Sequence, residues 1–330
     1  MEWVRDRDGR VPDFCTPIND PSWLQCDQDH GTQDGDAVVG FASGDSAWAL
    51  PWWIMKNHHV ANLTLAGQPV LIAFCETCAG AAAFTPVLEG DRYNLRLDGI
   101  YDGVILLSDF ETGSLWSPFT GHSIHGPLKD RQFERRQVIQ CTWAEWRTEH
   151  PDTLVIAGRG ESRKGHGEKF VNPDSQSPSY SRQERTAITR DRRLPPDQLV
   201  LGVVVDGRAR AYPLEQLHSV GGVLNDELGE TPILCLARPH TWIAAAFERS
   251  VDGRLLEFEM SNDGQLIDTA TRTRWDNFGQ GAEGPLAGQR LAFVPSGLEK
   301  WRSWFGPHPG TEVYRPDKLA GHRARARQGP

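Results

Sequence analysis

Two cysteines separated by two residues carry the strongest chemical signal in this sequence. Cys75 and Cys78 stand in the apolar run AFCETCAGAAAF, and the chain holds six cysteines in all. Two thiols at this spacing reach one metal ion when a turn lies between them, form a redox dithiol, or fill a core as small side chains. The residues alone leave these three interpretations open.

Histidines supply further donor atoms on both sides of the cysteines. His58 and His59 precede the cysteine segment, and His122 and His125 follow it in FTGHSIHGPL. Mixed sulfur and nitrogen ligand sets suit Zn²⁺, and thiolates also suit Cu(I). A histidine that binds no metal acts as a general acid or base, or is structural. We expect His58 and His125 to join the cysteines as metal ligands, and His59 and His122 to be catalytic.

Tyr101 and Asp102 are a further pair of candidates. They stand in YDGVILLSDFETG, where we expect them to line a pocket and belong to the catalytic group. Asp109 in the same stretch is predicted to form a turn, because Asp and Gly favour that role. The sequence contains neither a phosphate-binding glycine loop nor a nucleophile-elbow serine.

Composition restricts the class of partner. The chain has 330 residues and a formal net charge of -9, which argues against nucleic-acid binding. No window approaches the roughly 18 apolar residues of a membrane span, and the N-terminus lacks a secretory signal. We therefore predict a cytoplasmic protein with a small-molecule substrate and no membrane or nucleic-acid partner. Disulfides are unusual in that compartment.

The elements that must position these residues form two similar series. VVGFASGDSAWALP in the first half matches VLGVVVDGRARAYP in the second, and EWRTEHPDT matches KWRSWFGPHPGT, which pairs Trp146 with Trp301. Short β-branched or aromatic runs bounded by turn residues predict strands. Short helices are expected over 51–59, 142–150, 213–220 and 297–305.

This pattern predicts a β-rich α+β fold of two pseudo-repeats packed as one compact unit. The predicted divisions are an N-terminal extension (1–35), a first repeat with the Cys/His site (36–158), a polar linker loop (159–196), a second repeat that has lost the site (197–316) and a basic tail (317–330).

The two halves differ at the cysteines. Arg238 matches Cys75 and Thr241 matches Cys78 under the offset that aligns the flanking apolar runs. Core positions would be expected to keep small apolar residues, so the difference indicates a site in the first half. Asn62 recurs as Asn225 and is interpreted as part of the frame.

These landmarks resemble the DUF3179 family of uncharacterised bacterial and archaeal proteins. The resemblance rests on AWALPWWIMKNHHVANLTLAGQPVLIAFCETCAGAAAF, SDFETGSLWSPFTG, GPLKDR, TWAEWRTEHPDT and RRLPPDQLVLGVVVDGRARAYPL. The family pattern implies Glu where His59 stands, Gly where Ala79 stands, and Glu where His122 stands. It also implies Asn where Asp102 stands. These departures indicate a site altered from the common form.

Three functions follow as hypotheses. The first is a metal-dependent oxidoreductase, with copper favoured over zinc because the candidate ligands outnumber a closed four-ligand site. The second is a non-catalytic zinc- or copper-binding protein. The third is a metal-free dithiol oxidoreductase with a reversible Cys75–Cys78 disulfide, for which the thioredoxin-like βαβ context is missing.

Overall fold

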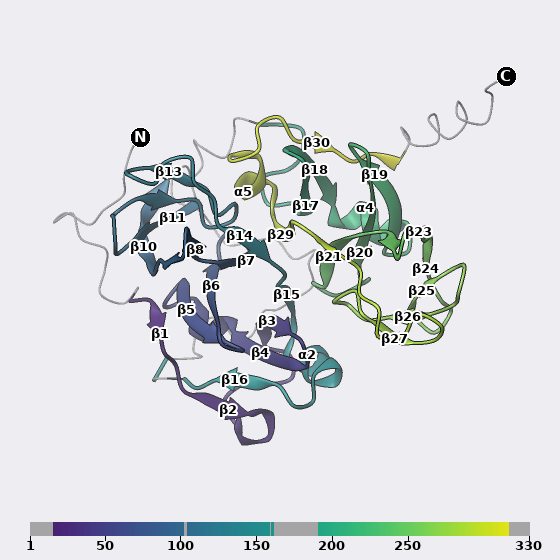
Figure 1. Cartoon of the computed structure of the whole chain (residues 1–330), viewed down its shortest axis with the longest axis horizontal. Helices are drawn as coiled ribbons and strands as arrows, with labels where there is room; N and C mark the ends of the chain where they lie inside the picture. The colour runs from purple at the N-terminus through teal and green to yellow at the C-terminus, as the bar shows by residue number, and fades with distance from the viewer. Residues whose placement is uncertain (1–15, 102–103, 159, 162–190, 317–330) are drawn as a thin grey trace.

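Strands dominate the chain, and its few helices are short (Figure 1). The computed structural model describes residues 16–101, 104–158, 160–161 and 191–316. The prediction of a β-rich fold with a few short helices is confirmed. Within the described ranges, no helix is both long enough and apolar enough to cross a membrane.

In the part of the N-terminal half that the structure describes, the strands form three sheets and a hairpin. The first sheet has the order β15 (Ile139–Thr142), β3 (Ala37–Ser43), β4 (Ser46–Pro51), β16 (Leu154–Ile156) and β2 (Trp23–Gln25). The second has the order β1 (Ile18–Asn19), β5 (Val60–Leu65), β6 (Gln68–Cys75), β7 (Gly80–Thr85) and β14 (Glu134–Arg136). The third has the order β10 (Leu95–Tyr101), β11 (Val104–Asp109), β12 (Leu115–Trp116) and β13 (Ser123–His125), and the hairpin comprises β8 (Val87–Leu88) and β9 (Asp91–Arg92).

The described residues of the C-terminal half, 191–316, also form three sheets and a hairpin. The first sheet has the order β29 (Ser296–Lys300), β17 (Leu199–Val205), β18 (Arg208–Pro213) and β30 (Glu312–Val313). The second has the order β19 (Val223–Leu228), β20 (Thr231–Ala237), β21 (Ala244–Glu248) and β28 (Phe293–Val294). The third has the order β24 (Phe258–Met260), β25 (Leu266–Asp268), β26 (Arg274–Trp275) and β27 (Gly281–Glu283), and the hairpin comprises β22 (Ser250–Val251) and β23 (Arg254–Leu255).

Among the described residues, α-helices follow strands at the four positions that the sequence predicted. They are α1 (Trp52–Met55), α2 (Trp143–Glu149), α4 (Leu214–Ser219) and α5 (Trp301–Phe305), with a 3-10 turn η2 (Cys26–Gln28) near the N-terminus. Helix α2 starts at a capping box, in which Thr142 and Glu145 satisfy each other's backbone N–H groups. The predicted helix over 297–305 was wrong in its first half. Residues 297–300 belong to β29, because they pair with β17.

Hairpin turns follow from residues that accept a positive φ. Asp206 and Gly207 connect β17 to β18 with φ values of 48° and 74°. A two-residue turn with both central residues at positive φ matches the twist of the strands it joins, and Asp-Gly is a favoured pair there.

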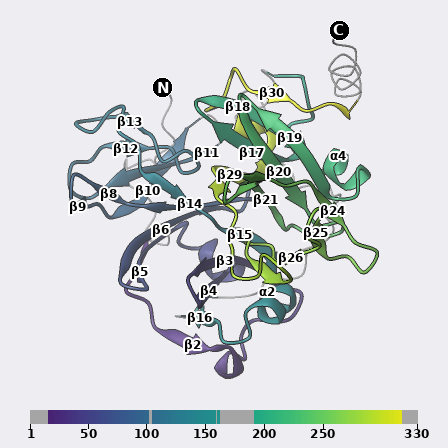
Figure 2. The ribbon, with the colours of Figure 1, turned by 45° about the vertical axis from the view of Figure 1, so that its right-hand side comes forward.

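The two halves lie side by side, and β29 runs along their junction beside β7 and β21 (Figures 1 and 2). Each half contributes to the core of the other. Ala79 packs into the apolar cluster of the C-terminal half around Leu201 and Leu298. Ile243 and Phe278 pack in return against Trp146 and its neighbours in the N-terminal half. The turn that follows Cys75 is therefore part of the junction.

The structure describes only part of the three segments predicted to lie outside the repeats, which are the N-terminal extension, the linker loop and the basic tail. Ile18–Asn19 pairs with β5 and Trp23–Gln25 pairs with β16, so this part of the predicted N-terminal extension completes two sheets. Most of the predicted linker loop (159–196) and the basic tail (317–330) lie outside the described residues.

Two glycines allow tryptophans of the helices to lie directly on strands. A Cβ atom at Gly40 would lie 2.0 Å from the Trp146 indole of α2, and one at Gly202 would lie 2.2 Å from the Trp304 indole of α5. Each indole N–H donates to a threonine hydroxyl beyond the helix, Trp146 to Thr153 at 2.8 Å and Trp304 to the matching threonine at 2.9 Å. These contacts fix where α2 and α5 stand at the junction.

Candidate functional site

Cys75 and Cys78 form a disulfide across the turn between β6 and β7. Cys75 ends β6 and pairs with Gly80 at the start of β7, and the two cysteine Cα atoms are 5.2 Å apart. The cysteines are 1% and 0% exposed, whereas Thr77 between them is exposed. The Thr77 hydroxyl lies 3.3 Å from Cys75 Sγ and 4.0 Å from Cys78 Sγ. The sulfurs therefore lie directly beneath a surface turn.

Groups from outside the turn hold three of its consecutive carbonyl oxygens. The Arg302 guanidinium of α5 donates to the Thr77 carbonyl, and the Lys300 backbone N–H donates to the Cys78 carbonyl at 2.9 Å. The Gln140 amide of β15 donates to the Ala79 carbonyl at 3.3 Å and to Leu298 in β29 at 3.1 Å. Both β29 and α5 thus help to hold the turn of the other half.

His59 lies at the base of the cysteine hairpin in a backbone conformation that favours glycine. Its φ is 61°, and its Nδ1 donates to the Phe74 carbonyl, next to Cys75, at 3.1 Å. The second half has Gly222 in the matching place, also at positive φ. Burial lowers the pKa of His59, against the opposing effects of the Phe74 carbonyl and Glu76. The imidazole is therefore neutral at pH 7, with Nε2 as its acceptor.

His58 is engaged at both ring nitrogens. Nδ1 lies 2.6 Å from the Thr16 carbonyl, and Nε2 lies 2.9 Å from Glu161 Oε1. These contacts tie α1 to residues before β1 and after β16. A metal ion at His58 would have to displace one of the two oxygen partners, so the structure gives this histidine a connecting role.

The other predicted histidines lie on the surface of the first half. His122 and His125 are both exposed, and His125 is the last residue of β13. Burial lowers the pKa of His308 to about 4, with additional effects from Arg135 and His122. His122 therefore lies close enough to the second half to act electrostatically on His308.

The sheet pairing does not bring Tyr101 to the cysteines. Tyr101 ends β10 opposite Val104, in a sheet separate from the one that holds Cys75. Asp102 lies outside the described residues. Asp109, predicted to form a turn, does so and is also buried, accepting from the Trp116 indole at 2.8 Å.

The predicted ligands do not converge on one point. Across residues 16–101, 104–158, 160–161 and 191–316, no group of three or more His, Cys, Asp or Glu side chains is placed to hold a metal ion. The copper and zinc assignments remain predictions from the sequence.

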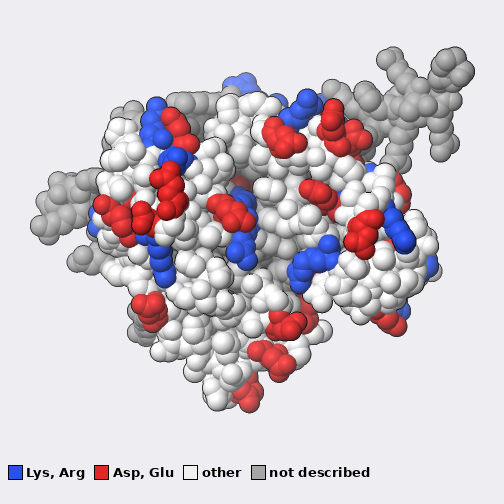
Figure 3. All heavy atoms as spheres, in the orientation of Figure 1, with Lys and Arg blue, Asp and Glu red and all other residues white. Residues whose placement is uncertain are grey.

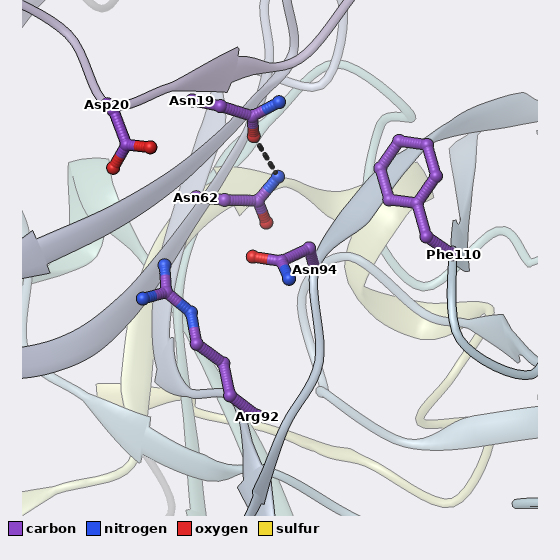
Figure 4. Close-up of a pocket in the computed structure, with 6 residues that line it drawn as sticks. All are labelled: Asn19, Asp20, Asn62, Arg92, Asn94 and Phe110. Carbon is purple, nitrogen blue, oxygen red and sulfur yellow. Dashed lines mark hydrogen bonds between the residues drawn. The ribbon is translucent and has the colours of Figure 1, made fainter.

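A cavity of about 520 Å³ lies elsewhere in the first half (Figure 4). Its lining includes Asn62 and Arg92, which are already bonded within the protein. Asn62 bonds Asn19 and both backbone groups of Leu95, and Arg92 donates to Thr64 and to a backbone carbonyl of β5. Asn225 bonds Phe258 in the same way, which supports the interpretation of Asn62 as part of the frame.

Sequence reasoning missed the groups that approach the turn from β14 and β29. Glu299 is 3% exposed, and a Cβ atom at Gly80 would lie 3.2 Å from its Cβ. Burial raises the pKa of Glu299 to about 8, with Arg135 opposing that effect. Arg135 donates to the carbonyl groups of Phe119 and Ser296. Neither residue stands in a recognisable motif, so only the fold reveals them.

The place matching the cysteines in the second half is a closed structural network. Arg238 stands where Cys75 stands and donates to the Asn277 side chain at 2.7 Å. Asn277 donates in turn to both carboxylate oxygens of Glu149 in α2, at 2.9 and 2.8 Å. The cysteine turn of the first half and the Arg238 network of the second half thus both contact the other half, but through different side chains.

Charged side chains do not form one broad patch on the face shown in Figure 3, where Lys and Arg alternate with Asp and Glu.

Comparison with known proteins identifies the family of this chain. A family model described as a protein of unknown function, DUF3179, matches residues 13–311. The chain belongs to the DUF3179 family. No curated protein and no solved structure matches it. What this DUF3179 protein does must therefore be argued from its own site.

The half-buried His308 gives this DUF3179 protein a specific acid sensitivity. Because the pKa of His308 is lowered to about 4, the folded state keeps it neutral while the unfolded chain protonates it near 6.5. Its contribution to stability is complete above pH 6.5 and is lost as the pH falls towards 4. We expect His308→Gln to reduce that loss by up to about 1.4 kcal/mol per pH unit, measured by urea unfolding. Equal pH slopes for the two proteins would contradict this assignment.

Proposed function

We propose that this protein is a thiol–disulfide oxidoreductase that acts on small-molecule thiols through Cys75 and Cys78. The observation that carries the proposal is the way the turn is held. Its Thr77, Cys78 and Ala79 carbonyl groups are all bonded from outside. These bonds do not involve the sulfurs, so the two thiols would stay next to each other after reduction.

A purely structural disulfide is the less favoured alternative, because this cross-link removes little entropy from the unfolded chain. The cysteines are three positions apart, so the bond closes a very short loop. Cross-linking about four residues removes roughly 2 kcal/mol of unfolded-state entropy, compared with about 3 for a 15-residue loop. In the cytoplasm, which we retain as the proposed compartment, disulfides are usually transient and catalytic or redox-sensing.

Burial of the sulfurs supports a small substrate. A folded protein surface could not reach atoms that lie beneath Thr77, because both cysteines are almost fully buried. A small thiol would approach the sulfurs past the exposed Thr77 side chain. Thr77 is then the hydroxyl available to donate to the Cys75 thiolate.

His59 is proposed as the base for the second thiol of the reductant, the one that releases Cys75. Its neutral imidazole keeps an acceptor at Nε2 while Nδ1 is fixed on Phe74, one residue from Cys75. A side chain retained at positive φ costs stability, and such positions often mark function. His58 and Glu161 would support the backbone that places it.

We infer that the two halves are copies of one unit, of which the first keeps the thiols. Matching bonds support this inference. Trp116 and Trp275 each donate to a buried aspartate seven residues earlier. The indoles of Trp146 and Trp304 each donate to a threonine seven residues later.

The test is thiol–disulfide exchange with defined small molecules. The full chain should accelerate oxidation of dithiothreitol by oxidised glutathione, and Cys75→Ser/Cys78→Ser should leave only the uncatalysed rate. Metal content is measured on the same samples by elemental mass spectrometry. No acceleration by either protein would refute the proposal, and close to one copper or zinc per chain that is lost in the double variant would restore the metal hypothesis.

A further inference from the structure

Glu299 is a buried carboxyl group that packs against the hairpin carrying the disulfide. It stands in β29 directly before Lys300, whose backbone N–H bonds Cys78. Its Cβ would lie 3.2 Å from a Cβ atom at Gly80, two residues beyond Cys78. The side chain is thus inserted from the second half against the hairpin of the first.

The environment of this carboxyl group is built to hold a proton. Within the described part of the chain, Glu299 Oε2 is buried and has no hydrogen-bond partner, and no ion pair joins Glu299 to Arg135. An unpaired carboxylate is costly to bury, so the neutral acid is favoured.

Charged or titratable groups stand on β14 and along the chain directly after Glu299. Arg135 on β14 is the charged group that acts on the carboxyl group. Lys300 and Arg302 are directed towards Asp197, with N···O distances of 3.4 and 3.7 Å. His308, beyond α5, has its pKa lowered to about 4 and is neutral at pH 7.

The other half provides an internal comparison. In the first half, Cys141 occupies the position that corresponds to Glu299 in the second half. Cys141 pairs with Val38 of β3, and Glu299 pairs with the corresponding valine of β17. Phe293 in the second half likewise corresponds to Arg135 in the first. Arg135 pairs with a phenylalanine of β7, and Phe293 pairs with the corresponding phenylalanine of β21. The buried carboxyl group and its arginine therefore occur on the side of the junction that carries the disulfide, and a thiol and a phenyl ring replace them on the other.

The geometry points to Glu299 as the group that gives a proton to Cys78 on reduction and takes it back on oxidation. This inference rests on the proposed redox site. A thiolate of the reductant attacks Cys75 Sγ, forming a mixed disulfide, and the S–S bond to Cys78 breaks. Cys78 leaves with the electron pair and takes the Glu299 proton. A second thiol of the reductant then releases Cys75 as a thiol, and the reductant leaves as a disulfide.

The experiment measures reduction of the full chain by dithiothreitol from pH 6 to 10. Rates are divided by the thiolate fraction of the reductant. Wild type should lose about tenfold or more in the normalised rate as the pH rises through about 8, because a general acid becomes deprotonated. Glu299→Gln, which mimics the neutral acid in shape, should be slower at pH 7 and lack this inflection.

Glu149→Gln is the matched control, because Glu149 lies at the junction on the side without the disulfide. It should keep the wild-type profile. An unchanged inflection in Glu299→Gln would overturn the role of Glu299 while leaving the redox site intact. A pair that cannot be reduced in either protein would instead overturn the proposed function, and the inference with it.

Discussion

Cys75→Ser will reduce thiol–disulfide exchange to the uncatalysed rate, a loss of at least about 1,000-fold. Removal of a group that forms a covalent intermediate has effects of this size or larger. The free energy of unfolding should fall by no more than about 2 kcal/mol, because the lost cross-link closes a short loop. Exchange between dithiothreitol and oxidised glutathione measures the first effect, and urea unfolding measures the second.

Cys141→Ser is the control for loss of a buried thiol. Cys141 is a free cysteine packed in the core of the first half. Its replacement should lower stability and leave the exchange rate unchanged. Exchange that survives Cys75→Ser, or that disappears in Cys141→Ser while the protein remains folded, would contradict the assignment of the reacting pair.

Gly202→Ala will destabilise the protein by about 3 kcal/mol or more, the upper range for overpacking a core. The added Cβ would lie 2.2 Å from the Trp304 ring, which is 4% exposed and has its indole N–H bonded. Helix α5 would have to move, and with it Arg302, which holds the Thr77 carbonyl. Chemical denaturation should show the loss of stability, and the remaining folded protein should exchange thiols more slowly.

Gly306→Ala provides the comparison at the end of the same helix. A Cβ at Gly306 meets nothing within 4 Å. Its effect on unfolding should stay within about 0.5 kcal/mol, as for an ordinary surface change. Equal stability of the Gly202 and Gly306 variants would show that α5 can move away from β17 without cost.

Local patterns in the sequence predicted most of the secondary structure. The run AVVGFAS coincides with β3, and the helix expected after Pro213 is α4. The spacing of apolar residues and the types of the flanking turn residues determine such elements locally. Two stretches were exceptions. Pairing with β17 overrides a helical spacing at 297–300, and a turn replaces the predicted helix at 56–59. The sequence also paired Trp146 with Trp301, whereas the indole bonds make Trp304 its counterpart.

The site was predicted only where it is local in sequence. The spacing of Cys75 and Cys78 singled out the pair, and His59 was named as catalytic, a role that remains a proposal. Glu299 could not be found in this way, because it is more than 200 residues away and is brought to the turn by the packing of the two halves. His58 was predicted as a metal ligand, but its ring nitrogens contact Thr16 and Glu161. These partners are distant in sequence, so local spacing could not reveal them.

The central claim is that Cys75 and Cys78 form a reversible redox couple in a protein that stays folded. The most direct measurement is a redox titration of the full chain in dithiothreitol buffers, with alkylation and peptide mass spectrometry to count reduced Cys75 and Cys78. Near-ultraviolet circular dichroism follows tertiary structure in the same samples. We expect both cysteines to be reduced together in one two-electron transition, with the aromatic signal unchanged. Cysteines that become reducible only as the aromatic signal collapses would show that the disulfide is a structural cross-link, and would contradict the account.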